Sequence, residues 1–318
     1  MTKQFYSNGK LLITGEYLVL DGALSLALPT LYGQSLTVKE TEKPLLSWKS
    51  LDEKGKIWFE TSFQLQQLSP ITPSQGTEKT VEDPSSIESA KITQTLRTIL
   101  LEAQKLNPDF LHTNTGMEIT TALNFPRDWG LGTSSTLINN IAQWAHVDAY
   151  TLLWNAFSGS GYDIACAQHN GPITYQLKDY TPVVHTVDFN PSFKNNLFFI
   201  HLNQKQDSRD GIANYRSQEK EVNLFSTLSQ INSITQRILS CSRLGQFEKL
   251  IKKHENIISQ ILGVPTVKEQ LFPDYKGAIK SLGAWGGDFI LATGNKSTPD
   301  YFKEKGYSTI IPYSKMTK

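Results

Sequence analysis

The sequence has little cysteine, no excess of one charge and no long apolar run. Its two cysteines, Cys166 and Cys241, cannot form a disulfide framework, and they favour reduced thiols in a cytoplasmic protein over a single disulfide. Lys and Arg number 31 against 30 Asp and Glu, which argues against general nucleic-acid binding because that needs a basic surface. No stretch reaches the roughly 18 apolar residues that a membrane span needs, and residues 1–10 hold no apolar signal core. We therefore expect a compact cytoplasmic protein, a monomer or homodimer, that binds neither nucleic acid nor membranes.

Strand and helix patterns are mixed along the 318 residues, a length that corresponds to about two domains. Short apolar or alternating runs predict strands at 11–13, 17–20, 35–39, 117–121, 173–175, 197–201 and 309–311, and hairpins at 45–65 and 283–294. Apolar residues at helical spacing predict helices at 86–105, 134–146, 214–240, 243–262 and 298–305. A regular βαβ rhythm is missing, so the pattern indicates an α+β fold. Residues 180–195 differ in composition, with Pro182 and Pro191 as breaks, and this predicts a boundary between two domains, 1–185 and 186–318.

Residues 69–86 form a polar stretch with several prolines and glycines, which is typical of a long loop. Two interpretations stay open: a tolerated insertion, or a lid over a site, because long loops in compact domains are often functional.

The clearest local signal is Gly130-Leu131-Gly132-Thr133-Ser134-Ser135-Thr136. Glycines let the backbone approach a ligand closely, and the hydroxyls begin an amphipathic helix whose unpaired amides attract an anion such as phosphate. Taken by itself, the segment is equally compatible with a glycine turn followed by a helix cap.

Three further segments carry weaker signals. In 158–165 the carboxylate of Asp163 stands among small residues, where it suits either a general base or a helix cap. In 8–17 Lys10 begins an apolar strand between two glycines. Its ammonium group is suited to a place beside a phosphate, or it lies on the surface as most lysines do. The glycine-rich segment 283–288 suits close backbone approach to a ligand or a plain hairpin turn.

In order and spacing the four segments together resemble the GHMP kinase superfamily, over nearly the whole chain from Lys10 to Ala292. Residues 9–20 and 286–288 look most like phosphomevalonate kinases and mevalonate kinases. The string Gly-Tyr-Asp-Ile-Ala at 161–165 is similar to a bacterial branch known by those letters, GYDIA. The resemblance implies two α+β domains: an N-terminal α/β domain with a mixed sheet that binds ATP, and a ferredoxin-like C-terminal domain.

The resemblance also implies roles for individual residues. Asp163 matches the catalytic aspartate and Lys10 the lysine that partners it, so we expect Lys10 within salt-bridge reach of Asp163. The segment Gly130, Leu131, Gly132, Thr133, Ser134, Ser135 and Thr136 matches the loop that binds the phosphates of ATP, with Ser134 at the position that helps to hold Mg²⁺. The matching substrate-side residues are Glu16, Tyr17, Gly283, Ala284, Gly286, Gly287 and Asp288. Many relatives also carry a magnesium-binding glutamate on the helix before the catalytic aspartate, and residues 151–155 offer no carboxylate.

The resemblance thus predicts an ATP-dependent kinase that acts on phosphomevalonate or mevalonate with Mg²⁺. Two alternatives remain: a kinase of the same family for another alcohol, such as homoserine or a sugar, and a nucleotide-binding protein of this fold without turnover. Tyr17 follows Glu16 where sugar kinases of the family carry histidine, which disfavours a sugar. The missing helix glutamate favours the non-catalytic alternative, whereas Lys10 and Asp163 favour an enzyme.

Overall fold

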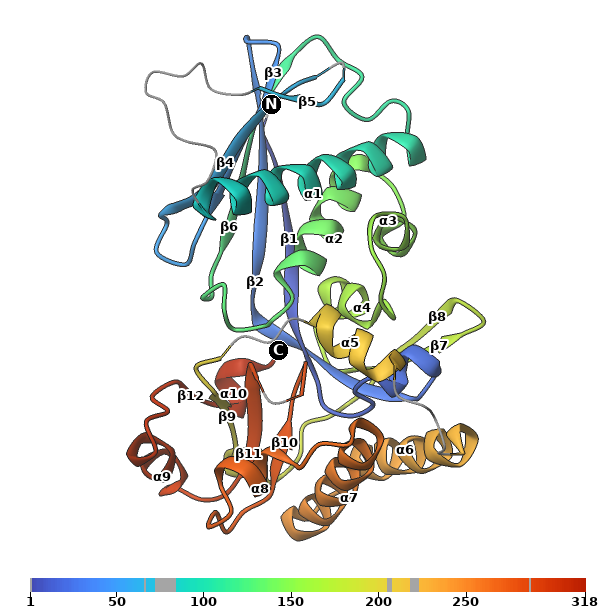
Figure 1. Cartoon of the computed structure of the whole chain (residues 1–318), viewed down its shortest axis with the longest axis vertical. Coiled ribbons are helices and arrows are strands. Elements are labelled where there is room, and N and C mark those ends of the chain that lie inside the picture. Colours follow the sequence, from blue (N-terminus) through green and yellow to red (C-terminus); the bar gives the residue numbers. More distant parts are fainter. Residues whose placement is uncertain (1, 66, 72–83, 205–207, 218–222, 286) are drawn as a thin grey trace. The chain divides into compact units, whose positions relative to one another are not determined.

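The computed structural model describes residues 2–65, 67–71, 84–204, 208–217, 223–285 and 287–318, and it has the expected α+β architecture (Figure 1). Contacts divide the chain into two units. The first unit contains residues 1–7, 33–126 and 133–159, and the second contains 8–32, 127–132 and 160–318. The units therefore interleave along the chain, whereas the sequence suggests a single division between residues 185 and 186.

The larger sheet has the strand order β5-β4-β3-β6-β2-β7-β8, with β1 paired to β2. These strands are β1 (Thr2–Leu12), β2 (Ser25–Thr41), β3 (Leu45–Leu51), β4 (Ile57–Gln64), β5 (Ser69–Pro70), β6 (Gly116–Leu123), β7 (Ile173–Lys178) and β8 (Thr181–Thr186). The sheet is mixed, because β3 pairs parallel to β6 whereas β2 pairs antiparallel to it. Strand β3 shows why these segments extend: Leu46, Trp48 and Ser50 alternate as buried residues with half-buried neighbours, the period-2 pattern of a strand.

Three helices complete the first unit: α1 (Pro84–Leu106), α2 (Thr133–Ala145) and α3 (Ala149–Ala156). Figure 1 shows α1 crossing in front of the strands of this unit. Helix α2 is tied to the sheet by polar contacts: Ser7 Oγ donates to Asn140 Oδ1 at 2.8 Å, and Asn140 Nδ2 donates to the carbonyl of Gln34 at 2.9 Å. The helices predicted at 86–105 and 134–146 are thereby confirmed.

The second unit contains a four-stranded antiparallel sheet with the order β10-β11-β9-β12. This unit also contains β7, β8 and the parts of β1 and β2 within residues 8–32. Its further elements in chain order are η1 (Leu18–Asp21), α4 (Tyr162–Gln168), η2 (Lys194–Asn196), β9 (Leu197–His201), α5 (Ser208–Ser217), α6 (Leu224–Leu239), α7 (Leu244–Leu262), α8 (Val267–Leu271), β10 (Ile279–Ser281), β11 (Phe289–Thr293), α9 (Thr298–Glu304), β12 (Ile310–Pro312) and α10 (Tyr313–Met316). From β9 onward, the order strand, helices, strand, strand, helix, strand gives the predicted ferredoxin-like arrangement.

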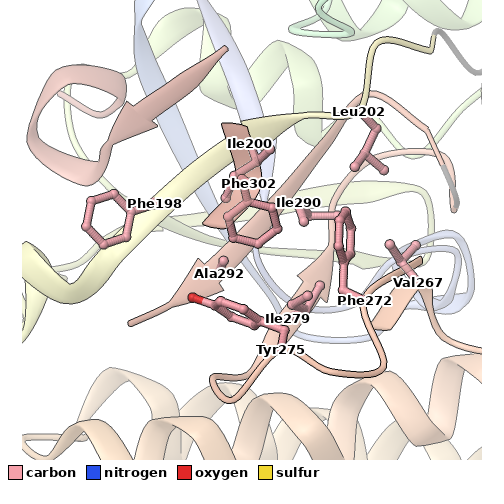
Figure 2. Close-up of a cluster of buried hydrophobic side chains, with 10 residues drawn as sticks. All are labelled: Phe198, Ile200, Leu202, Val267, Phe272, Tyr275, Ile279, Ile290, Ala292 and Phe302. Atoms are coloured by element: carbon pink, nitrogen blue, oxygen red, sulfur yellow. The ribbon is translucent and has the colours of Figure 1, made fainter. Parts of the chain in front are cut away.

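Apolar side chains hold this smaller sheet together (Figure 2). Phe198 and Ile200 come from one face of β9, as the period of a strand requires, and Leu202 directly follows the strand. They pack with Phe272 and Phe302, which are fully buried and meet edge to face at 5.1 Å. Truncating either ring to Ala would cost about 3–5 kcal/mol.

The structure corrects two predicted elements. The apolar run 17–20 is the short helix η1 and not a strand, because Gly22 caps it in the left-handed conformation and both Leu18 and Val19 are buried. The single helix predicted at 214–240 is replaced by the end of α5 and by α6, and Asn223 caps the start of α6. The lid hypothesis concerns a segment of which residues 72–83 lie outside the described part. In the part of the chain that the structure describes, no helix combines the length and apolar character needed to cross a bilayer.

Candidate active site

Lys10 lies in a small recess of the second unit, where three of the segments identified in the sequence meet. Its side chain is 7% exposed, and its ammonium group donates to the carbonyl oxygen of Gly130 at 3.0 Å. The backbone amide of Lys10 donates to the carbonyl of Leu131, also at 3.0 Å. The recess has a volume of about 10 Å³ and is lined by Lys10, Leu11, Leu12, Trp129, Gly130, Leu282, Gly283, Asp288 and Phe289. This is space for about one water molecule.

Asp288 and Gly130 approach each other so closely in this recess that only glycine fits at position 130. A Cβ atom on Gly130 would lie 2.3 Å from Cγ of Asp288, and the φ of 64° also favours glycine. Asp288 is 5% exposed and held by its backbone, since its N–H donates to Gln204 and its carbonyl accepts from Leu202. The residues that directly follow β9 therefore fix the glycine-rich segment beside Gly130.

Trp129 anchors the segment that precedes Gly130. Its ring meets those of Tyr32 and Phe289 edge to face, at 5.1 and 5.4 Å. The neighbouring carbonyl of Asp128 lies 3.2 Å from Nε2 of His201. Aromatic packing thus holds residues 127–132 firmly on strands β9 and β11.

Asp163 lies in the first turn of α4, after Gly161 in the left-handed conformation at a φ of 87°. Burial raises the pKa of Asp163, and the positive charge of Lys10 lowers it in part. Among the residues that the structure describes, no ion pair joins Lys10 to Asp163; the ammonium group lies on the carbonyl of Gly130 and 5.8 Å from the ring of Tyr162. The two side chains therefore act on each other through their charges, and the salt bridge that we expected between them is not formed.

The hydroxyl residues 133–136 form the first turn of α2 in the first unit. Ser134 is exposed there, while Ser135 and Thr136 are buried. The hydroxyl of Thr136 donates to Gln34 Oε1 at 2.9 Å, so this residue fixes the helix to β2. Within this turn, the helix N-terminus and the exposed hydroxyl of Ser134 are groups suited to a phosphate.

Glu16 is 1% exposed and belongs to a buried charge cluster. The ammonium group of Lys280, from β10, lies 2.5 Å from Glu16 Oε1 and 3.1 Å from Glu255 Oε1. Burial raises the pKa of Glu16 to about 7, although Lys280 lowers it. His254 Nε2 accepts the amide hydrogen of Gly15 at 2.9 Å, and burial holds the pKa of this histidine well below its ordinary value. This imidazole is neutral at physiological pH.

Tyr17 connects the first segment to the glycine-rich one. Its hydroxyl oxygen accepts the backbone N–H of Trp285 at 3.2 Å, and its ring lies 5.5 Å from that of Tyr215 on α5. Tyr17 itself has an unusual positive φ of 61°. The hydroxyl of Tyr215 and the guanidinium group of Arg216 both donate to Asp21, which fixes α5 to η1.

Four of the predicted site residues thus line one recess: Lys10, Gly130, Gly283 and Asp288. In the same unit, Glu16 contacts Lys280 and Tyr17 contacts Trp285. Ala284 is buried beside them, and its carbonyl accepts the N–H of Gly287. Gly286 lies outside the described residues.

Four further residues of these clusters do not belong to the set predicted from the sequence: Lys280, Glu255, His254 and Trp129. One signal existed for Lys280: a lysine within the short apolar run 278–282, directly before the glycine-rich segment, is the same pattern that singled out Lys10.

The helix α3, which precedes Asp163 in the chain, carries no carboxylate that could hold a metal ion. Asp148, the acidic residue nearest to the helix 149–156, caps that helix and accepts from the amide and hydroxyl of Thr151 at 2.7 and 2.8 Å. Over the described part of the chain, no three His, Cys, Asp or Glu side chains come together in a way that suits a metal ion.

Comparisons with known proteins identify the fold. No protein-family model and no curated protein sequence matches the chain significantly. Among solved structures, a Methanococcus jannaschii mevalonate kinase superposes with a TM-score of 0.67 at 14% identity, over 98% of this chain and 97% of that one. A Streptococcus pneumoniae phosphomevalonate kinase gives 0.63 at 13% identity, over 98% of each chain, and a Lactococcus lactis galactokinase gives 0.62 at 13%, over 96% and 88%. These neighbours are GHMP kinases, and the chain has their two-domain fold.

Proposed function

We propose that the protein is an ATP-dependent kinase that phosphorylates a small alcohol or phosphate. One observation carries this proposal: a buried lysine, a carboxylate and a glycine-rich backbone meet in one recess, with Asp163 in electrostatic reach of that lysine. Phosphoryl transfer needs this combination, because the reaction depends on positioning and on neutralising charge more than on covalent chemistry. The fold of the structural neighbours supports the same reaction class.

Residues 130–136 bind the phosphates of ATP in this proposal. The glycines admit a phosphate close to the backbone, and the amides at the start of α2 donate to its oxygens. The ammonium group of Lys10 lies beside this segment and stabilises the negative charge that develops on the transferring phosphoryl group.

Asp163 acts as the general base. It takes the proton of the acceptor hydroxyl while that oxygen forms a bond to the γ-phosphorus and the bond to the β-phosphate oxygen breaks, leaving ADP. Because burial raises its pKa, this carboxylate is a stronger base than an exposed aspartate. A phosphate acceptor uses the same step with a phosphate oxygen as the nucleophile, and it needs no proton transfer when that oxygen is ionised.

The hydroxyl of Ser134 is the protein group that fits Mg²⁺, because it is exposed in the first turn of α2. Magnesium keeps several waters and binds phosphates, so one protein oxygen is compatible with its preferences. The ion would neutralise phosphate charge. Asp148 is engaged as a helix cap and does not supply the helix carboxylate that many GHMP kinases carry.

For the acceptor, we propose phosphomevalonate or mevalonate, on the basis of the sequence motifs and of neighbours that include both kinases. Homoserine or a sugar is the second candidate, supported by the galactokinase among the neighbours. Glu16, Tyr17 and residues 283–288 form the acceptor side of the site in this proposal. A nucleotide-binding protein without turnover is the remaining alternative.

A coupled assay of ADP formation tests the proposal with mevalonate, phosphomevalonate, homoserine and galactose as separate acceptors. We expect acceptor-dependent ADP release with one of the first two and Mg-ATP. ADP release with homoserine or galactose alone would correct the acceptor. Binding of ATP in calorimetry without turnover on any acceptor would establish the non-catalytic alternative.

A further inference from the structure

The buried cluster around Lys280 contains one negative group more than it contains positive ones. Lys280 is fully buried, and its ammonium group contacts Glu16, Glu255 and the carbonyl of Ser281, at 2.5, 3.1 and 2.5 Å. Glu16 and Glu255 are 1% and 3% exposed. With both carboxylates ionised, the cluster has a net charge of −1 and no access to water. An unbalanced buried charge is costly, and a buried acid avoids that cost by binding a proton.

Burial raises the pKa of both Glu16 and Glu255, and the surroundings of Glu16 Oε2 favour the proton on Glu16. This oxygen is buried and has no hydrogen-bond partner among the described residues, and it lies 3.4 Å from Nε2 of His254. Because Nε2 already accepts the amide hydrogen of Gly15 at 2.9 Å, it carries no hydrogen that it could donate to Oε2. An ionised Oε2 is therefore buried without a donor, whereas protonation of Glu16 removes that uncompensated charge.

The charged and titratable groups that act on Glu16 are Lys280, Glu255, Tyr17, Tyr162 and His254, and their effects differ in sign. Lys280 on β10 favours the ionised form, and Glu255 on α7 opposes it. Tyr17 and Tyr162 are neutral neighbours whose own ionisation Glu16 opposes. His254 is neutral, because burial and the charge of Lys280 both act against its protonation. The one cation therefore faces two carboxylates.

The cluster also joins two segments that the proposed function assigns to the acceptor. Glu16 and Gly15 belong to the turn that begins η1, and Lys280 and Ser281 lead into the glycine-rich segment. Ser281 Oγ donates to Glu255 Oε2 at 3.1 Å, so α7 supports the same junction. At the far side of the junction Tyr17 accepts the N–H of Trp285.

We propose that Glu16 and Lys280 are positioning residues for acceptor binding: their ion pair fixes the Gly15–Tyr17 turn to residues 281–285, and the junction is tightest when the cluster holds one proton. The positioning part rests on the proposed kinase function, and the proton part does not. Neither residue needs to touch the acceptor, since both act through the backbone that carries Tyr17 and Trp285.

Two single variants separate charge from position. Glu16→Gln and Glu255→Gln each leave one carboxylate for Lys280, but only Glu16→Gln breaks the link between the turn and β10. Glu248→Gln is the matched control, because Glu248 is a half-buried acid on the same helix α7 that accepts from Thr293 outside the cluster. Thermal melts of wild type and the three variants are recorded between pH 5 and pH 8. The KM values for the acceptor and for ATP are measured for the same four proteins at pH 6 and pH 8.

For the proton, we expect wild type to lose stability between pH 5 and pH 8 relative to both cluster variants. A group with a raised folded-state pKa stabilises below its unfolded pKa and loses this contribution as the pH rises through the folded pKa. The difference in Tm between Glu16→Gln and wild type should grow by about 5 °C over this range, and Glu248→Gln should run parallel to wild type. Parallel melting curves for all four proteins would overturn the proton assignment, whether or not the protein is a kinase.

For the position, we expect Glu16→Gln to raise the acceptor KM about tenfold at pH 6 with an unchanged KM for ATP, and Glu255→Gln to raise it less. Hydrogen exchange of the Gly15 and Trp285 amides gives a readout without turnover, and both should exchange about tenfold faster in Glu16→Gln. Wild-type exchange rates at both amides, in a folded Glu16→Gln protein, would overturn the positioning role. Absence of turnover on every acceptor would instead count against the proposed function alone.

Discussion

Two clusters in the second unit each place one lysine near two carboxylates, and they differ in how the charges meet. Lys280 is fully buried and contacts Glu16 and Glu255 directly, at 2.5 and 3.1 Å. Lys10 is 7% exposed and donates to a backbone carbonyl, while Asp163 acts on it through space and Asp288 lines the same recess. Charges that neutralise each other hold a fold together, whereas a lysine that is not paired with a carboxylate remains available to a ligand. The Lys280 cluster therefore holds segments of the backbone in position, and the Lys10 recess is suited to chemistry.

The largest expected effect is on turnover, in Asp163→Asn. If Asp163 is the base, the rate should fall about 10²–10⁴-fold while ATP affinity and Tm change little, because the amide keeps the shape and loses the proton acceptor. Steady-state kinetics and a thermal melt on the same preparation measure both.

Asp148→Ala is the matched control, because Asp148 caps α3 in the way that an ordinary helix-start aspartate does. This variant should lose about 1 kcal/mol of stability and keep its rate per folded molecule. A full rate in Asp163→Asn, with lowered stability, would mean that Asp163 is only a cap.

The two lysines should respond oppositely to the same substitution. Lys280→Met leaves two carboxylates buried without a cation, and breaking a buried pair costs about 3–5 kcal/mol. Lys10→Met should change the free energy of unfolding by less than about 1 kcal/mol, because its ammonium group makes one backbone hydrogen bond. Denaturant titration at pH 8 compares them, and equal losses of stability would remove the distinction between the clusters.

Gly130→Ala should disturb the recess without touching the Lys280 cluster. The new Cβ would lie 2.3 Å from Cγ of Asp288 at a φ that disfavours side chains, so a cost of about 1–3 kcal/mol is expected. ATP affinity, measured by calorimetry, should fall at least about tenfold. Gly171→Ala is the control, since a Cβ there meets no atom within 4 Å, and it should bind ATP like wild type. Unchanged affinity in Gly130→Ala would argue against close phosphate approach at this loop.

Tyr17→Phe should have the smallest effect. It removes the hydrogen bond between Tyr17 and the glycine-rich segment 283–288. Removing the hydroxyl leaves the N–H of Trp285 without this acceptor, a loss of about 1 kcal/mol. The acceptor KM should rise about fivefold, with the KM for ATP unchanged. The same rise in both KM values would show that Tyr17 affects the site generally.

Local patterns were enough to predict much of this molecule. Apolar spacing located α1, α2 and α7, and glycines with hydroxyls marked residues 130–136. The strand predicted at 17–20 was wrong. Its apolar residues have high strand propensity, but Gly22 and the positive φ of Tyr17 determine the local backbone.

The Lys280 cluster was beyond the sequence for a different reason. Its members come from the turn before η1, from α7 and from β10, and only the tertiary fold brings Glu16 within 3.4 Å of His254 and Lys280 within 3.1 Å of both glutamates. The same holds for the recess, since the approach of Asp288 to Gly130 depends on β9 and on the packing of Trp129.

Phosphorus NMR of ATP with the purified protein, Mg²⁺ and mevalonate or phosphomevalonate tests the kinase assignment most directly. The γ-phosphate signal should decline while a new signal of a phosphorylated acceptor grows in equal amount, and Asp163→Asn should slow this transfer by at least about a hundredfold. Unchanged spectra with every acceptor tried, from a folded protein that binds ATP, would contradict the assignment.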